Sequence, residues 1–190
     1  MRTIIMLILT VLGLALQPLS AQNTEGSDNY KYYKAVELLD EGGDPQEARK
    51  LAVENIKANP KHIDSYLLIA GIDRREADYA SALRQIEQAM KNNHRDSGFS
   101  EALLLWWKAI IYDELGNTRK AVDTMEQVVK MARKTDKEHL VSMMENLAQF
   151  RYDLKEYDAS DAVYREIMKI DESTLLPRIG RARNLIARDR

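Results

Sequence analysis

Cysteine is absent from this 190-residue sequence, and tryptophan and phenylalanine occur only twice each. Without cysteine the chain cannot form disulfides, thiolate metal sites or a cysteine nucleophile. Its net charge of −2 lacks the broad excess of Lys and Arg with which nucleic-acid-binding proteins displace counterions. We therefore expect no nucleic-acid partner, and a domain that is stabilised by packing alone.

Catalytic motifs are also missing from the sequence. Neither a G-x-G-x-x-G pattern nor a P-loop occurs. The three histidines, His62, His94 and His139, fall in separate segments, so no two of them share one helical face. Since no set of acid, base and nucleophile can be assembled, the sequence predicts no enzyme, no cofactor and no metal site.

The one long apolar run lies at the amino terminus. Arg2 is followed by the uncharged stretch Ile4–Leu16, then by Pro18 and the small residue Ala21. This order is typical of a secretory signal peptide, and the run is too short for a comfortable membrane anchor, which is the alternative. We expect a signal peptide at 1–21, a linker at 22–27 and no membrane span after cleavage. The absence of cysteine favours export to a bacterial periplasm or cell surface.

A repeated pattern fills the rest of the chain. Four segments begin at Gly43, Ala77, Gly116 and Lys155, and the second and third intervals between these starts are longer than the first. Each segment carries a small residue five positions on, and apolar residues then follow at helical spacing. The small residues are Ala48, Ala82, Ala121 and Ser160. A second helical stretch with its own apolar face precedes each segment, so every unit is predicted to be a helix, a tight turn and a helix.

With Pro60 as a closing proline, these units resemble the tetratricopeptide repeat (TPR) family, although Lys155 stands where the family has a turn glycine. The resemblance implies an all-α, right-handed superhelical solenoid of antiparallel helix pairs over residues 28–190, with about four and a half repeats. The predicted units are 28–61, 62–100, 101–139 and 140–173, followed by a terminal helix at 174–190. The two longer intervals are interpreted as lengthened loops between repeats.

The terminal helix has three interpretations. With Ala182 and Leu185 on its packing face, it is either a solvating cap, which repeat arrays need at their ends, or the start of a further unit in a truncated array. The third interpretation is self-association, in which this helix stacks on another copy of the chain.

In the family resembled here, the first helices of the repeats line a concave groove. Projected onto that face, the candidate partner-binding residues are Tyr33, Leu67, Arg74, Leu103, Trp106, Ile110, Asp113 and Gln149. The apolar centre of this set predicts an interaction site, with Trp106 as its anchor. The alternative is that Trp106 or Trp107 belongs to the core, because adjacent residues point about 100° apart on a helix. The groove lacks the Lys and Asn residues of a carboxylate clamp.

The sequence thus predicts a non-catalytic scaffold of the cell envelope that binds a protein partner, either a peptide segment or a helix, in its groove. The alternative function is the truncated repeat region of a larger envelope enzyme or of a secretion or assembly component.

Overall fold

The computed structural model describes residues 29–94, 101–135 and 139–189, and this part of the chain contains α-helices and turns but no strand. The expected all-α repeat fold is therefore confirmed. The expected leader at 1–21 and linker at 22–27 lie outside the described residues. The chain divides into two compact units at the bond between Asn59 and Pro60. No helix among the described residues is long and apolar enough to cross a bilayer.

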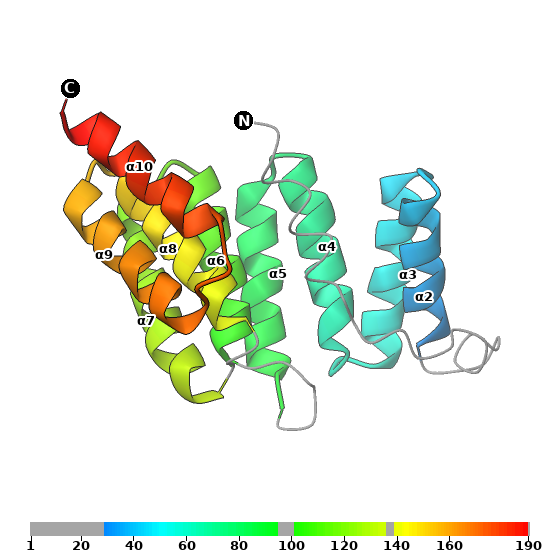
Figure 1. Ribbon diagram of the computed structural model, residues 1–190. Helices are drawn as coiled ribbons and strands as arrows, with labels where there is room; N and C mark the ends of the chain where they lie inside the picture. Colours follow the sequence, from blue (N-terminus) through cyan, green and yellow to red (C-terminus); the bar gives the residue numbers. More distant parts are fainter. Residues whose placement is uncertain (1–28, 95–100, 136–138, 190) are drawn as a thin grey trace. The chain divides into compact units, whose positions relative to one another are not determined.

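In the described residues, the first unit is one helix pair, α2 (Tyr30–Asp40) and α3 (Pro45–Ala58). Asp44 caps α3 because its side chain accepts a hydrogen bond from the Gln46 amide at 2.9 Å, and Pro45 suits the first helical position. The small residues Ala35 and Ala48 are fully buried, which lets the two helices approach closely. The predicted helix–turn–helix unit is thus formed here (Figure 1).

The second unit contains seven helices in the described residues. They are α4 (Ile63–Arg75), α5 (Tyr79–Asn92), α6 (Glu101–Glu114), α7 (Thr118–Thr135), α8 (Leu140–Asp153), α9 (Tyr157–Ile170) and α10 (Leu176–Arg188). Helices α4 and α5, α6 and α7, and α8 and α9 form pairs, and α5, α7 and α9 also pack on the helix that follows (Figure 1). This is the packing of a helical repeat, in which each element contacts its neighbours in the sequence.

The turns inside the pairs repeat one hydrogen-bonding pattern. Ala77, Gly116 and Lys155 all adopt positive φ angles, of 61°, 78° and 62°, at the end of α4, α6 and α8. Their amides, and those of the residues after them, donate to carbonyls in the last helical turn, as in a Schellman motif. Lys155 holds this conformation without glycine's freedom, so the departure from the family pattern costs backbone strain but leaves the turn intact.

The long interval between the third and fourth segments does not come from a longer loop alone. Helix α7 has 18 residues, whereas α5 and α9 have 14 each. The expectation of a purely lengthened loop after Met131 is therefore wrong, because Ala132 to Thr135 continue the helix. Ala132 is fully buried, which explains why the chain stays helical there.

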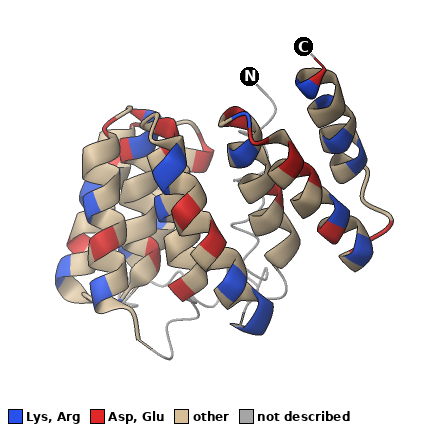
Figure 2. Ribbon diagram, turned by 90° about the vertical axis from the view of Figure 1, so that its left-hand side faces the viewer, with Lys and Arg blue, Asp and Glu red and all other residues tan. Residues whose placement is uncertain are grey.

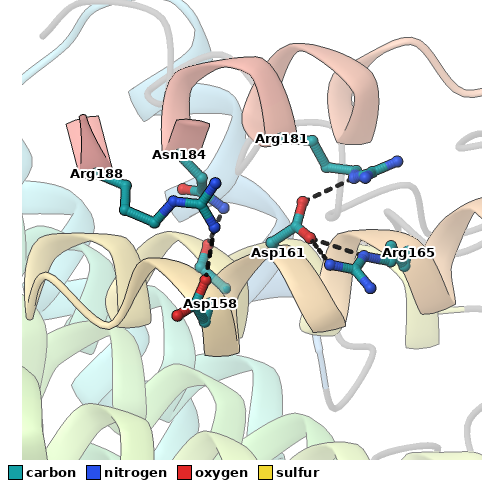
Figure 3. Close-up of polar contacts among 7 residues, drawn as sticks. Asp158, Asp161, Arg165, Arg181, Asn184 and Arg188 are labelled. Carbon is teal, nitrogen blue, oxygen red and sulfur yellow. Dashed lines mark hydrogen bonds and ion pairs between the residues drawn. The ribbon is translucent and has the colours of Figure 1, made fainter. Parts of the chain in front are cut away.

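The last helix, α10, docks on α9 through a small and polar surface. Ser160 donates to the Ala148 carbonyl at 2.7 Å and accepts from Asn184 at 3.0 Å, so this buried polar group is fully partnered. Asp161 accepts hydrogen bonds from Arg165 and from Arg181, the latter at 2.7 Å (Figure 3). Burial alone would raise the pKa of Asp161, but these two guanidinium groups hold it below its usual value.

Candidate interaction face

The first helix of each pair in the second unit contacts the first helix of the next. Arg74 on α4 donates to the Glu114 carboxylate on α6 at 2.9 Å. Trp106 on α6 donates from its indole nitrogen to Asn146 on α8 at 2.6 Å. We call the surface formed by α4, α6, α8 and α10 the first-helix face. Acidic and basic residues are mixed over most helices of the molecule, but α10 carries only basic ones (Figure 2).

The last contact of this series joins α8 to α10. A guanidinium nitrogen of Arg183 donates to the Gln149 side chain at 2.6 Å, and the same guanidinium lies 4.0 Å from the centre of the Tyr152 ring. Gln149 also donates to Asp153 at 2.8 Å. The side-chain amide of Gln149, a predicted groove residue, thus uses both of its polar atoms: its nitrogen donates to Asp153 and its oxygen accepts from Arg183.

Two of the predicted groove residues are not exposed. Trp106 is 5% exposed and Leu67 is 6% exposed. The expectation that Trp106 presents its ring to a partner is therefore wrong, since the ring lies in the core and its nitrogen is used by Asn146. Trp107, by contrast, is half-buried. Of the two interpretations of this pair, the core interpretation holds for Trp106.

The other predicted groove residues of the second unit are at least partly accessible. Leu103, Ile110 and Asp113 are half-buried on α6, and Arg74 is half-buried at the end of α4. Tyr33 lies on α2 in the first unit, where the centres of its ring and the Tyr32 ring are 5.3 Å apart in an edge-to-face arrangement. The structure therefore places the accessible candidates of the second unit on α4, α6 and α8, and Tyr33 is described only within its own unit.

Carboxyl groups on the face are poorly solvated. Burial raises the pKa of Asp113, a hydrogen bond from Thr118 lowers it, and the charge of Asp153 raises it further. Burial also raises the pKa of Glu114, against the opposing charge of Arg74. Burial alone raises the pKa of Glu145. Asp113 and Glu145 are therefore less stable as anions than they are in water, and a cation beside them would be favoured, whereas Glu114 is exposed and already has Arg74 beside it.

The sequence analysis missed two residues of this face, Asn146 and Arg183. The repeat spacing contains a signal for both, because each stands one unit after a residue of the preceding first helix. The distance along the chain from Trp107 to Asn146 equals the distance from the repeat start Gly116 to the repeat start Lys155. The distance from Gln149 to Arg183 equals the shorter one between the first two repeat starts, Gly43 and Ala77. The polar contacts that these side chains make across helices are not visible in that spacing.

Asp64, in the first turn of α4, shows the strongest effect of burial in this unit. Burial raises its pKa from 3.8 to about 6, although a backbone hydrogen bond lowers it. Its Oδ1 atom is buried and has no hydrogen-bond partner among the described residues. Ionisation of Asp64 therefore destabilises the folded state.

Replacing Asp64 with asparagine should stabilise the protein at neutral pH. Below about pH 3 both the folded and the unfolded wild-type chain hold the proton, so the substitution should change little. As the pH rises to about 6, Asp64 ionises first in the unfolded chain. Above pH 6 it is ionised in the folded chain as well, and the folded state is then destabilised by the full amount. A pKa difference of about two corresponds to roughly 3 kcal/mol, so we expect a gain of about 1–3 kcal/mol.

Urea unfolding of the wild-type chain and of Asp64→Asn at pH 7.5 and at pH 4 measures this gain. Asp123→Asn, at an exposed position on α7, is the control and should show no comparable pH dependence. An equal effect of Asp64→Asn at both pH values would contradict the expectation.

The repeats of the second unit match a known sequence family. The profile of the tetratricopeptide repeat matches residues 102–135 and 141–174, which contain the α6–α7 and α8–α9 pairs. These two segments are tetratricopeptide repeats. The TPR resemblance seen in the sequence is thereby confirmed for them. No curated protein matches the sequence of the chain.

Solved TPR structures share the fold of the chain. A TPR protein from Parabacteroides merdae superposes with a TM-score of 0.67 at 20% identity, over 85% of this chain and 60% of its own length. A TPR protein of Thermus thermophilus gives a TM-score of 0.64 at 16% identity, over 86% of this chain and 84% of its own. YrrB, described as a TPR protein with an unusual peptide-binding site, gives 0.61 at 9% identity, over 90% and 82%. At these identities the likeness shows an all-α helical repeat fold. The chain spans less than two thirds of the Parabacteroides protein.

Proposed function

We propose that this protein is a non-catalytic scaffold, and that the first-helix face of its second unit binds a segment of another protein. The TPR fold supports a role in protein–protein interaction, and YrrB provides a case of this fold described with a peptide-binding site. On the first-helix face, half-buried apolar side chains lie on the same helix as destabilised carboxylates. This combination is the observation on which the proposal rests.

The chemistry of the face indicates which segment it would hold. Leu103 and Ile110 on α6 offer apolar contact, while Asp113 and Glu114 follow at the end of the same helix. Burial raises the pKa of Asp113, so a Lys or Arg side chain from a partner would relieve its poor solvation, whereas Glu114 is already paired with Arg74. We infer that the partner segment, a peptide or a helix, alternates apolar and basic residues.

A peptide display library, selected on the purified chain, tests this function. We expect selected peptides to combine basic and apolar residues, and binding of a selected peptide to weaken at least about tenfold in Ile110→Asp and in Asp113→Lys. Ile170→Ser is the matched control, because Ile170 is 49% exposed but lies on α9. Peptides without this composition, or a control that weakens binding equally, would contradict the proposed face.

The place of action is a further part of the proposal. We propose export to the periplasm or surface of a bacterium, supported by the order of charged, apolar and small residues in 1–21. Expression in a bacterial host followed by amino-terminal sequencing of the periplasmic product tests it. We expect the mature chain to begin at Gln22, and an uncleaved chain in the cytoplasm would contradict the proposal. The alternative proposal is that the chain is the truncated repeat region of a larger envelope enzyme or of a secretion or assembly component, and the chain spans 60% of the Parabacteroides TPR structure.

A further inference from the structure

Helix α10 presents an apolar face to solvent. Of the eight large hydrophobic residues that are exposed among the described residues, five lie between positions 175 and 186, with exposed fractions from 46% to 63%. They are Leu175, Leu176, Ile179, Leu185 and Ile186. Ala182, between Ile179 and Ile186, is also exposed. At about 100° per residue, Leu175, Ile179, Ala182 and Ile186 form one stripe along the helix.

The opposite side of α10 is the one that docks on the repeat. Pro177, Gly180 and Asn184 are buried there, and Asn184 donates to Ser160. Arg181 and Arg188 reach from the flanks to Asp161 and Asp158 on α9 (Figure 3). The helix thus uses small and polar residues for its contact with α9 and leaves its aliphatic residues outside, the reverse of an ordinary surface helix.

The repeat itself indicates what belongs on this stripe. Helices α4, α6 and α8 each pack on the helix that follows them in the second unit. Helix α10 is the one first helix in the described part of that unit with no such following helix. Its Ala182 stands one repeat unit after Ala148, which is fully buried on α8. A helix with an apolar face is therefore the occupant that the stripe fits.

We propose that the occupant is α10 of a second copy of this chain, packed antiparallel across a two-fold axis between Ile179 and Ala182. Each Ile179 then packs on the small Ala182 of the other copy, and each Leu175 lies beside Ile186 of the other copy. The two-fold relation makes the stripe self-complementary, as a homodimer interface must be. Antiparallel helices also place opposite ends of their dipoles together.

The area of the stripe is consistent with a weak pairing. Arg181 and Arg188 are paired with Asp161 and Asp158 of their own chain, which offsets part of the positive charge of α10. Arg178 and Arg183 donate to neutral oxygens, those of the Glu172 carbonyl and the Gln149 side chain, so they keep their charge and weaken the pairing. Five half-exposed aliphatic side chains leave roughly 300 Å² of apolar surface open on each chain. When the polar side chains around each stripe are included, the total surface that two copies would bury comes near the lower limit of stable interfaces, about 1,200 Å². The dimer is therefore weak and depends on concentration.

Single-cysteine variants of the full chain test the arrangement, because the natural sequence contains no cysteine. Leu175→Cys is mixed with affinity-tagged Ile186→Cys and the mixture is oxidised. We expect the mixed disulfide dimer to exceed each like–like dimer by at least about tenfold, since like positions lie roughly 16 Å apart along an antiparallel pair, beyond disulfide reach. Leu115→Cys, also at an exposed aliphatic position, replaces Leu175→Cys in the control and should give only background crosslinking.

Sedimentation velocity of the cysteine-free chain over a concentration series completes the test. We expect a monomer–dimer equilibrium that Ile179→Glu abolishes and Ile170→Glu leaves in place, with circular dichroism unchanged in both. A monomer at every concentration, a dimer that survives Ile179→Glu, or crosslinking that favours like–like pairs would each overturn the proposal. Because the peptide-binding test uses Ile110 and Asp113, either proposal can fail without the other.

Discussion

Replacing Trp106 with alanine is expected to destabilise the protein by about 3–5 kcal/mol, the usual cost of truncating a buried tryptophan. The side chain is 5% exposed, and its indole nitrogen donates to Asn146 on the next first helix at 2.6 Å. The substitution therefore opens a cavity and also removes a hydrogen bond between α6 and α8. Equilibrium unfolding in urea measures the loss.

Trp107 provides the matched control for this experiment. It is the adjacent residue and has the same side chain, but it is half-buried, so we expect Trp107→Ala to cost about 1–2 kcal/mol. Trp106→Phe should fall between the two, because it keeps much of the apolar volume and loses the hydrogen bond. Unfolding free energies for Trp106→Ala that equal those of the wild-type chain, combined with weaker peptide binding, would restore the groove-anchor interpretation.

Introducing a methyl group at Gly180 should detach α10 from α9, at a cost of about 1–3 kcal/mol for overpacking. A Cβ atom there would lie 2.3 Å from the ring of Tyr164, which is itself 5% exposed and has little room to move. We expect Gly180→Ala to raise hydrogen exchange in α10 first, because among the described helices it packs mainly on α9.

Gly71→Ala is the control for Gly180→Ala. Gly71 also lies inside a helix, α4, but a Cβ atom there meets nothing within 4 Å. Alanine is the better helix former, so this variant should be more stable than the wild-type chain by up to about 1 kcal/mol. If hydrogen exchange in α10 and the free energy of unfolding of Gly180→Ala were both unchanged, the Tyr164 ring would have moved aside without loss of stability, and the expectation would be wrong.

The candidate face could be predicted from the sequence only in outline. The repeat spacing placed Leu103, Ile110, Asp113 and Gln149 on the first helices, and these residues are partly accessible there. The exposure of Trp106 could not be predicted, because neighbouring helical positions differ by about 100° and a small rotation of the helix decides which ring is covered. Similarly, Arg183 lies on this face only because α10 brings its guanidinium to Tyr152 and Gln149.

The terminal helix shows the same limit. Its existence and its approximate range followed from the repeat length, but Ala182 and Leu185, expected on its packing face, are exposed. The surface that docks on α9 is instead Pro177, Gly180 and Asn184. A pattern of apolar residues shows that a helix has an apolar face, but not which neighbour covers it. Here Asp158, Ser160 and Asp161 on α9 select the polar side of α10.

By itself, the sequence determined the helical repeat, since small residues and apolar spacings recur unit after unit and set both the helices and their close pairing. The local sequence does not favour the positive φ angle of Lys155, which adopts the conformation of its counterpart Gly116 because the paired helices impose the turn. Only the tertiary structure decided which side chains stay accessible. The rotation of each helix against its neighbours decides three features: the burial of Trp106, the raised pKa of Asp64 and the outward stripe of α10. That rotation arises from packing and hydrogen bonds between helices, which no single helix encodes.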